Sequence, residues 1–116
     1  MPQVLIVDDE AMIRQVVRSA LTTSGYRVLD AESPDQALQT LADNPDLDLL
    51  VTDIVMPDGN GCDLALRMRE RNPLLPVLFI SGYEPERLSE VPSSGFLQKP
   101  FRITELLERV RRLLAN

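Results

Sequence analysis

Five short apolar runs alternate along the chain with longer stretches that have the spacing of amphipathic helices, and this alternation most limits the possible folds. The runs cover residues 3–7, 27–31, 47–51, 76–80 and 95–98. Some of them are apolar on both faces, as strands of a parallel sheet covered by helices must be. Strict alternation of strands and helices implies parallel strands joined by right-handed crossovers. The sequence therefore predicts an α/β fold, with a doubly wound sheet of five parallel strands and helices on both faces.

The first two helical stretches carry recognisable ends. Apolar residues between Met12 and Leu21 fall on one face of a helix that Gly25 can end. Ser33, with Gln36 three residues later, forms a capping-box pattern that opens a second helix. These signals predict helices between the first and second runs and between the second and third.

Two further helices are predicted from apolar faces over 64–68 and 103–114. The segment 84–94 contains two prolines and only two apolar anchors, so a helix there is expected to be short. At 116 residues, the chain is the size of a single domain.

Composition and charge argue against binding of nucleic acid, insertion into a membrane and secretion. A net charge of -6 with scattered arginines argues against direct binding of nucleic acid, because phosphate backbones are bound by clustered positive charge. No apolar run is long enough to span a bilayer, and the first ten residues do not resemble a signal peptide. The lone Cys62 permits no internal disulfide, which fits a reducing compartment. We expect a cytoplasmic protein without membrane contact.

Polar residues follow four of the five predicted strands. Asp8 and Asp9 follow the first strand, Asp53 the third, Ser81 the fourth and Lys99 the fifth. In a doubly wound sheet, ligands bind beyond the carboxyl ends of the strands. Each residue alone could be a helix cap, a turn residue or a surface charge. Together they predict a site, because three carboxylates at one edge repel each other unless a cation lies among them.

The residue types at this edge favour phosphoryl chemistry on an aspartate. Oxygen ligands, in a chain without histidine, select a hard cation, and Mg²⁺ suits a site of few carboxylates best. Lys99 is the only lysine in the chain, and its amine can act as a point charge on a phosphoryl oxygen. A carboxylate can attack a phosphoryl group to give an aspartyl phosphate. The metal and the lysine would stabilise the transferring charge, and the Ser81 hydroxyl could donate to it.

Four stretches in this order resemble the chemotaxis-type receiver domain of two-component response regulators. They are "VDDE" (7–10), "DIVMPDGNG" (53–61), "ISGY" (80–83) and "KPF" (99–101), and the resemblance covers essentially the whole chain. It is strongest to receivers of hybrid histidine kinases, although free-standing receivers remain an alternative. The resemblance implies a flavodoxin-like fold with strand order 2-1-3-4-5. The stretch between Ser81 and Lys99 is several residues shorter than usual, which shortens the expected fourth helix.

The resemblance also assigns roles to residues. It implies that Asp53 is phosphorylated and that Ser81 and Lys99 are ligands of the phosphoryl group. It implies that Mg²⁺ is held by Asp8, Asp9, Asp53 and the backbone carbonyl of Val55. On phosphorylation, Ser81 moves toward the phosphoryl group and the ring of Phe96 turns inward, although Phe96 could equally be a plain core residue. The bond between Lys99 and Pro100 is expected to be cis.

A receiver would be a signalling domain rather than an enzyme with its own substrate. The donor would be the phosphohistidine of a histidine kinase or histidine phosphotransfer domain, or a small phosphodonor such as acetyl phosphate. The domain would promote its own phosphorylation. Its autodephosphorylation is expected to be slow, because Val55 and Tyr83, two positions after Asp53 and Ser81, are not acids or amides that would readily align water. We expect one receiver domain over 1–116, no effector domain, and an output partner outside this chain.

The residues leave two other functions as alternatives. A pseudo-receiver would keep the fold and bind a partner independently of phosphate, but every expected site position is filled here. A phosphatase with an aspartyl-phosphate intermediate usually has an Asp-x-Asp loop and a large cap insertion, and neither is present.

Overall fold

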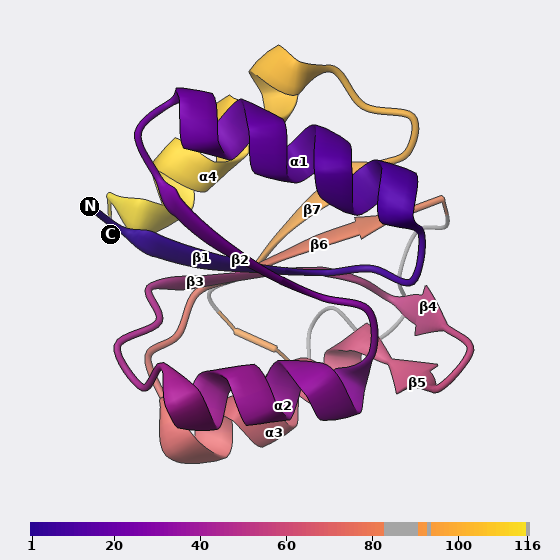
Figure 1. The fold of residues 1–116 in the computed structure, drawn as a ribbon, viewed down its shortest axis with the longest axis vertical. Coiled ribbons are helices and arrows are strands. Elements are labelled where there is room, and N and C mark those ends of the chain that lie inside the picture. Colours follow the sequence, from indigo (N-terminus) through magenta and orange to yellow (C-terminus); the bar gives the residue numbers. More distant parts are fainter. Residues whose placement is uncertain (83–90, 93, 116) are drawn as a thin grey trace.

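A five-stranded parallel sheet forms the centre of the molecule (Figure 1). The computed structural model describes residues 1–82, 91–92 and 94–115. The strands are β1 (Gln3–Val7), β2 (Arg27–Ala31), β3 (Leu49–Asp53), β6 (Val77–Ser81) and β7 (Ser94–Gln98). They lie in the order β2-β1-β3-β6-β7, and each neighbouring pair is parallel. Counted along the chain, this is the order 2-1-3-4-5, so the predicted doubly wound fold is confirmed.

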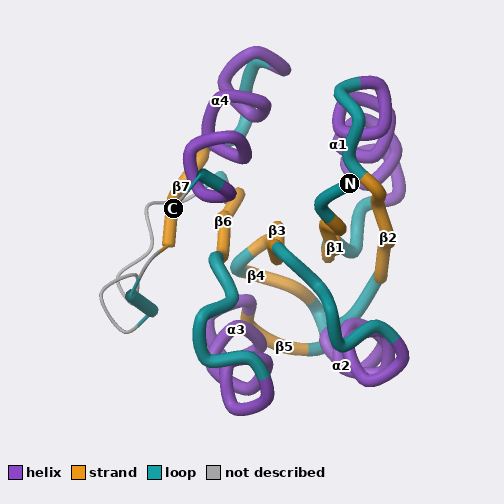
Figure 2. Tube along the Cα trace, turned by 90° about the vertical axis from the view of Figure 1, so that its left-hand side faces the viewer, coloured by secondary structure: helices purple, strands orange, loops and turns teal. Residues whose placement is uncertain are grey.

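Helices cover both faces of the sheet, as Figure 2 shows end-on. α1 (Ala11–Thr23) and α4 (Ile103–Leu114) lie on one face, and α2 (Pro34–Asp43) and α3 (Gly61–Arg71) lie on the other. Each pair encloses its own apolar core with the sheet. The helices contribute buried side chains to these cores, among them Val17, Leu21, Leu106 and Val110 on the first face and Ala37, Leu41, Leu64 and Met68 on the second.

The ends of α1 and α2 follow the sequence signals closely. After α1, Gly25 has a positive φ of 93°, which a residue without Cβ adopts freely. At the start of α2, the Ser33 side chain accepts a hydrogen bond from the backbone N–H of Gln36 at 3.2 Å. The return bond of the expected capping box falls one residue earlier, because the Gln36 side chain accepts from the backbone N–H of Glu32.

A small antiparallel hairpin between β3 and α3 was not predicted from the sequence. It consists of β4 (Val55–Met56) and β5 (Gly59–Asn60), and it lies beside the carboxyl end of the sheet (Figure 1). The Asn60 side chain caps α3 by accepting from the N–H of Cys62 at 2.7 Å. The hairpin therefore connects the end of β3 directly to a capped helix.

The strand β3 begins and ends two residues later than the predicted run 47–51, so that Asp53 is its last residue. The helix expected within 84–94 lies largely outside the described residues. Within the part of the chain that the structure describes, none of the helices is long and apolar enough to cross a membrane.

Candidate functional site

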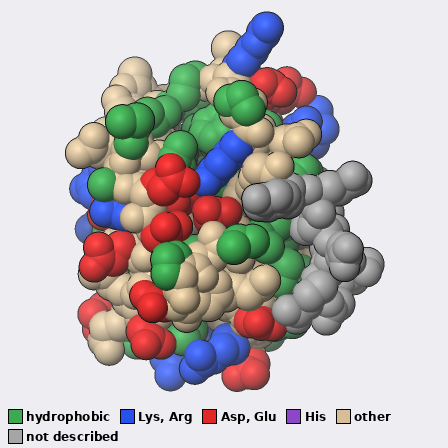
Figure 3. Space-filling model, turned by 90° about the vertical axis from the view of Figure 1, so that its right-hand side faces the viewer, with side chains coloured by type: hydrophobic (Ala, Val, Ile, Leu, Met, Phe, Trp, Pro, Cys, Tyr) green, Lys and Arg blue, Asp and Glu red, His purple; other side chains and the backbone are tan. Residues whose placement is uncertain are grey.

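The carboxyl edge of the sheet gathers the charged residues that follow its strands. Figure 3 shows this edge face-on, with acidic side chains grouped around a basic one near the middle of the face. Asp8 directly follows β1, and its backbone N–H donates to the carbonyl of Ala31 at 3.2 Å. Lys99 directly follows β7, and its backbone N–H donates to the carbonyl of Ser81 at 2.8 Å. Sheet-like hydrogen bonds therefore fix the backbone of both residues.

Lys99 is the centre of the site. Its Nζ lies 3.0 Å from Oδ2 of Asp8 and 3.2 Å from Oδ2 of Asp53. The Asp8 side chain is fully buried and that of Asp53 is 9% exposed, so these ion pairs are shielded from water on most sides. The carboxylate of Glu10 lies 3.6 Å from the same amine but is mostly exposed. Lys99 thus bridges carboxylates that come from two different strand ends.

The second oxygen of each buried carboxylate is also held. Oδ1 of Asp8 accepts from the backbone N–H of Glu10 at 2.9 Å, and Oδ1 of Asp53 accepts from the N–H of Ile54 at 2.7 Å. Both side chains therefore have fixed orientations before any ligand binds. Such preorganisation is what electrostatic catalysis requires, because no reorganisation is then needed during the reaction.

Burial and ion pairing shift the pKa values of two of these groups. Burial raises the pKa of the Asp8 carboxyl, although the hydrogen bond from the Glu10 N–H and the contact with Lys99 act in the opposite direction. Burial lowers the pKa of the Lys99 amine, but its hydrogen bonds and charge interactions with Asp8 and Asp53 outweigh this effect and leave the pKa raised. Lys99 is therefore protonated at neutral pH.

The carboxylates fit a hard divalent cation. One oxygen from each of Asp8, Glu10 and Asp53 lies within 4.8 Å of the others. Three oxygen donors of negative charge at this spacing suit Mg²⁺, whose remaining ligands are commonly water and phosphate oxygens. The structure therefore contains an acidic group consistent with a magnesium and phosphorylation site.

The structure adds Glu10, which the sequence reasoning did not name, to the acidic group. Asp9 is exposed and lies outside the group of three carboxylates found among the described residues. Glu10 is the N-cap residue of α1, and its backbone N–H donates a hydrogen bond to Oδ1 of Asp8. This hydrogen bond keeps Glu10 close to the site. The sequence signal that could have identified Glu10 is its place as a third acid in "VDDE", two residues after Asp8. The assignments of Asp9 and of the Val55 carbonyl as ligands stay predictions.

The residues expected to transmit a signal lie on β6, the neighbour of β3, and on β7, the edge strand beyond β6. Ser81 ends β6 and is buried. Phe96 on β7 is half-buried, stands opposite Phe79 in the sheet and packs against the core on the α2 and α3 face. The carbonyl of Phe96 accepts a hydrogen bond from Arg109 of α4. The Lys99–Pro100 bond is cis, the isomer that the resemblance implies.

Comparisons with known proteins agree on one family. The model of the response regulator receiver domain matches residues 4–111. The DNA-binding transcriptional regulator NtrC of Rhizobium meliloti is 39% identical over 97% of this chain, and the match covers 24% of NtrC. The chain therefore spans about a quarter of the length of that relative.

Solved structures agree with the sequence comparisons. The receiver domain of the hybrid histidine kinase CckA is 37% identical, with a TM-score of 0.86 over 97% of this chain and 98% of that one. The response regulator TrrA of Thermotoga maritima, solved with Mg²⁺ and BeF, is 30% identical, with a TM-score of 0.85 over 98% of this chain and 100% of that one. With the fold, the acidic group and the bridging lysine, these matches establish that the chain belongs to the response regulator receiver domain family of two-component systems.

Proposed function

We propose that the chain is a phosphoryl-accepting switch in which Asp53 receives the phosphoryl group. The observation that carries this proposal is the contact of Lys99 with Asp53 and Asp8, at 3.2 and 3.0 Å, at the carboxyl edge of the sheet. A buried carboxylate in contact with a fixed cation is a suitable nucleophile for a negatively charged phosphoryl group, because the cation offsets the repulsion between them.

The donor is a phosphohistidine on a partner protein, since this chain has no histidine. A carboxylate oxygen of Asp53 attacks the phosphorus atom, the new O–P bond forms, and the P–N bond to the imidazole breaks. The imidazole leaves with the electron pair of that bond and takes up a proton. The name of the relative CckA, a hybrid histidine kinase, supports a histidine kinase or a phosphotransfer domain as the partner.

Each site residue has a task in this transfer. Asp8 and Asp53, with Glu10 or Asp9, would hold Mg²⁺, which neutralises charge on the phosphoryl oxygens when it is bound. The Lys99 amine, already beside Asp53, donates to a phosphoryl oxygen, and the Ser81 hydroxyl donates to another. The fixed orientation of the Asp53 carboxylate, held by the Ile54 N–H at 2.7 Å, limits the loss of entropy on reaction.

The domain is a signalling module rather than an enzyme with a separate substrate. It promotes its own phosphorylation and loses the phosphoryl group slowly, because Val55, the side chain two positions after Asp53, cannot align a water molecule. Phosphorylation changes a surface that a partner or an output domain outside this chain recognises. Its location in the cytoplasm, where such donors act, is part of the same proposal.

Incubation with acetyl phosphate and Mg²⁺ tests the proposal. We expect intact-mass spectrometry to show one added phosphoryl group on the wild type and none on Asp53→Asn. Asp58→Asn is the matched control, because Asp58 is an exposed acid five residues further along the chain. The proposal is overturned if the wild type gains no phosphoryl group, or if Asp53→Asn gains one at the wild-type rate.

A further inference from the structure

Arg14 connects the acidic site to strand β2. Its Nη1 donates to the backbone carbonyl of Asp8 at 2.7 Å, and its Nε lies 3.6 Å from Oδ2 of Asp30 on β2. The side chain of Arg14 is only 16% exposed, although it comes from the first turns of α1. A largely buried guanidinium with a partner on each side has little freedom to move, so the carbonyl of Asp8 is held in one direction.

The held carbonyl belongs to the peptide unit that joins Asp8 to Asp9. Because a peptide unit is planar, fixing its carbonyl also fixes the N–H of Asp9 and the direction in which the chain leaves Asp8. The other groups of Asp8 are bonded to Ala31, Glu10 and Lys99. Arg14 constrains the backbone carbonyl of Asp8. Within the described residues, its ion pair is with Asp30 and not with a carboxylate of the site.

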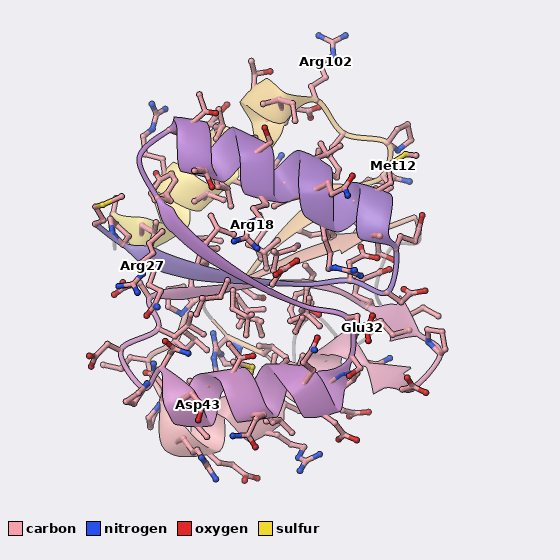
Figure 4. All side chains as sticks on the ribbon, in the orientation of Figure 1. Met12, Arg18, Arg27, Glu32, Asp43 and Arg102 are labelled. Atoms are coloured by element: carbon pink, nitrogen blue, oxygen red, sulfur yellow. The ribbon has the colours of Figure 1, made fainter. Side chains whose placement is uncertain are left out.

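Asp30 compensates the charge of Arg14. An uncompensated cation beside the acidic group would compete with a divalent metal, because like charges repel. Asp30 is paired both with Arg14 and with Arg18, whose Nη1 lies 2.9 Å from Oδ1 of Asp30. Figure 4 labels Arg18 on α1, and its side chain is 52% exposed. Arg18 therefore shares the partner of Arg14, but in the part of the chain that the structure describes only Arg14 of the two donates a hydrogen bond to Asp8, which makes Arg18 a natural control.

We infer that Arg14 is a positioning residue for magnesium binding: it orients the turn from Asp8 to Glu10, and it does not act through its charge. The inference rests on the proposed function, because that function supplies the metal. The two roles predict opposite outcomes when the guanidinium is removed. Loss of a nearby positive charge alone would tighten Mg²⁺ binding, whereas loss of a positioning contact would weaken it.

Calorimetric titration of the unphosphorylated protein with Mg²⁺ distinguishes the two roles. We expect Arg14→Met to weaken binding by roughly 10- to 100-fold, the usual effect of removing a group that orients a ligand. Arg18→Met, which loses the other ion pair to Asp30, should bind within about twofold of the wild type. Arg14→Lys keeps the charge, but a single amine cannot contact Asp8 and Asp30 as the forked guanidinium does, so it should also bind more weakly than the wild type.

Amide hydrogen exchange without metal gives an independent readout. The N–H of Glu10 donates to Oδ1 of Asp8, so we expect this amide to lose protection in Arg14→Met and to keep it in Arg18→Met. Unchanged or tighter Mg²⁺ binding in Arg14→Met overturns the inference, as does wild-type binding by Arg14→Lys if Arg14→Met does not fold. In either case the proposed function stands, because the wild type still binds the metal. If the wild type binds no Mg²⁺, the inference and the metal dependence of the proposed function both fail.

Discussion

At the scale of single residues, the site depends on one amine among carboxylates. Lys99 is 17% exposed and contacts the buried carboxylates of Asp8 and Asp53. Removing one partner of a buried ion pair costs much more free energy than the pair itself contributes to stability, because the remaining charge stays buried without compensation. The same amine would be lost as a donor to the transferring phosphoryl group. Loss of Lys99 should therefore lower both the stability of the fold and the rate of phosphorylation.

The first prediction concerns Lys99→Met. Without Mg²⁺, we expect its free energy of unfolding to fall by about 3 kcal/mol, because two carboxylates lose their counter-charge. Phosphorylation by acetyl phosphate should slow by about 100-fold or more, the usual effect of removing one charged donor. Urea denaturation and intact-mass kinetics measure the two effects. Arg67→Met is the control, since Arg67 is exposed on α3, and a similar loss in that variant would contradict a specific role for Lys99.

The second prediction concerns the carboxyl of Asp8, whose pKa is raised mainly by burial. A raised pKa in the folded state means that protonation favours folding, so this contribution is present at low pH and is lost as the pH rises through the folded pKa. We therefore expect Asp8→Asn, which mimics the neutral form, to melt at a higher temperature than the wild type at pH 7 without Mg²⁺. This difference should shrink toward pH 4.

Magnesium should reverse the order of the two proteins. Saturating Mg²⁺ stabilises the folded state of a protein that binds it, so the melting temperature of the wild type should rise while that of Asp8→Asn changes little. Thermal unfolding followed by circular dichroism, with and without Mg²⁺, measures both effects. A variant that melts lower than the wild type in metal-free buffer at pH 7 would show that the ion pair with Lys99 outweighs the burial of Asp8.

At the scale of elements, the close packing of α3 against the end of β3 determines where Asp53 lies. The N–H of Gly61 donates to the carbonyl of Ile54 at 2.7 Å. A Cβ atom on Gly61 would lie only 2.0 Å from the backbone oxygen of Asp53, a distance that forces the backbone to shift. Glycine is therefore needed at the start of α3 for steric reasons.

The third prediction follows from this contact. Gly61→Ala should lower the free energy of unfolding by at least about 2 kcal/mol, because the new methyl group displaces either α3 or the end of β3. It should also slow phosphorylation, since the displaced backbone carries Asp53. Gly82→Ala is a matched control, because a Cβ atom there meets nothing within 4 Å. Equal stability of Gly61→Ala and Gly82→Ala in urea denaturation would contradict the steric argument.

The elements that the sequence predicted best are those defined by an apolar run and a terminal signal. β1 and β2 match their predicted ranges, and α2 begins directly after the predicted cap Ser33. The third run predicted a strand that was two residues too early, because Leu47 is buried without belonging to β3. An apolar run records burial, whereas a strand is defined by its register, and Leu49 is the first residue of β3 in register with β1.

The parts that sequence patterns missed depend on local turns. The hairpin of β4 and β5 has two residues in each strand, which is too short for an alternating pattern to be recognised. Likewise, strand ends predicted that Asp8, Asp53 and Lys99 would meet, and the structure brings them together. The turn after β1 decided which neighbouring acid joins them, and its hydrogen bond from Glu10 to Asp8 could not be inferred from composition.

At the scale of the whole molecule, the sheet connects the site to the far side of the domain. Asp53 on β3 is opposite Ile80 on β6, one residue before Ser81. The carbonyl of Ser81 accepts from the N–H of Lys99, so the ends of β6 and β7 are joined beside the site. Earlier on β7, on the side away from the site, the carbonyl of Phe96 accepts a hydrogen bond from Arg109 of α4. A change at Asp53 therefore has a continuous set of contacts leading to α4.

Contiguity alone does not establish coupling, because a signal also requires an element with two arrangements whose balance the site can shift. Phe96 is a suitable element, since its side chain is half-buried and packs at the border of the core on the α2 and α3 face. If phosphorylation draws Ser81 toward Asp53, the ring of Phe96 can move inward, and its backbone contact with Arg109 must follow. Without the ring, the space vacated by Ser81 would have no group to fill it.

The last prediction tests this route with beryllofluoride and Mg²⁺, which mimic a bound phosphoryl group. In two-dimensional NMR spectra of the wild type, we expect amide shifts near Asp53, along β7 and on α4 around Arg109. Phe96→Ala should keep the shifts near Asp53 and lose those on α4. Leu66→Ala truncates another partly buried side chain at the same core and should keep both sets. Wild-type shifts confined to the loops around Asp53, or equal loss in both variants, would show that the signal does not pass through Phe96.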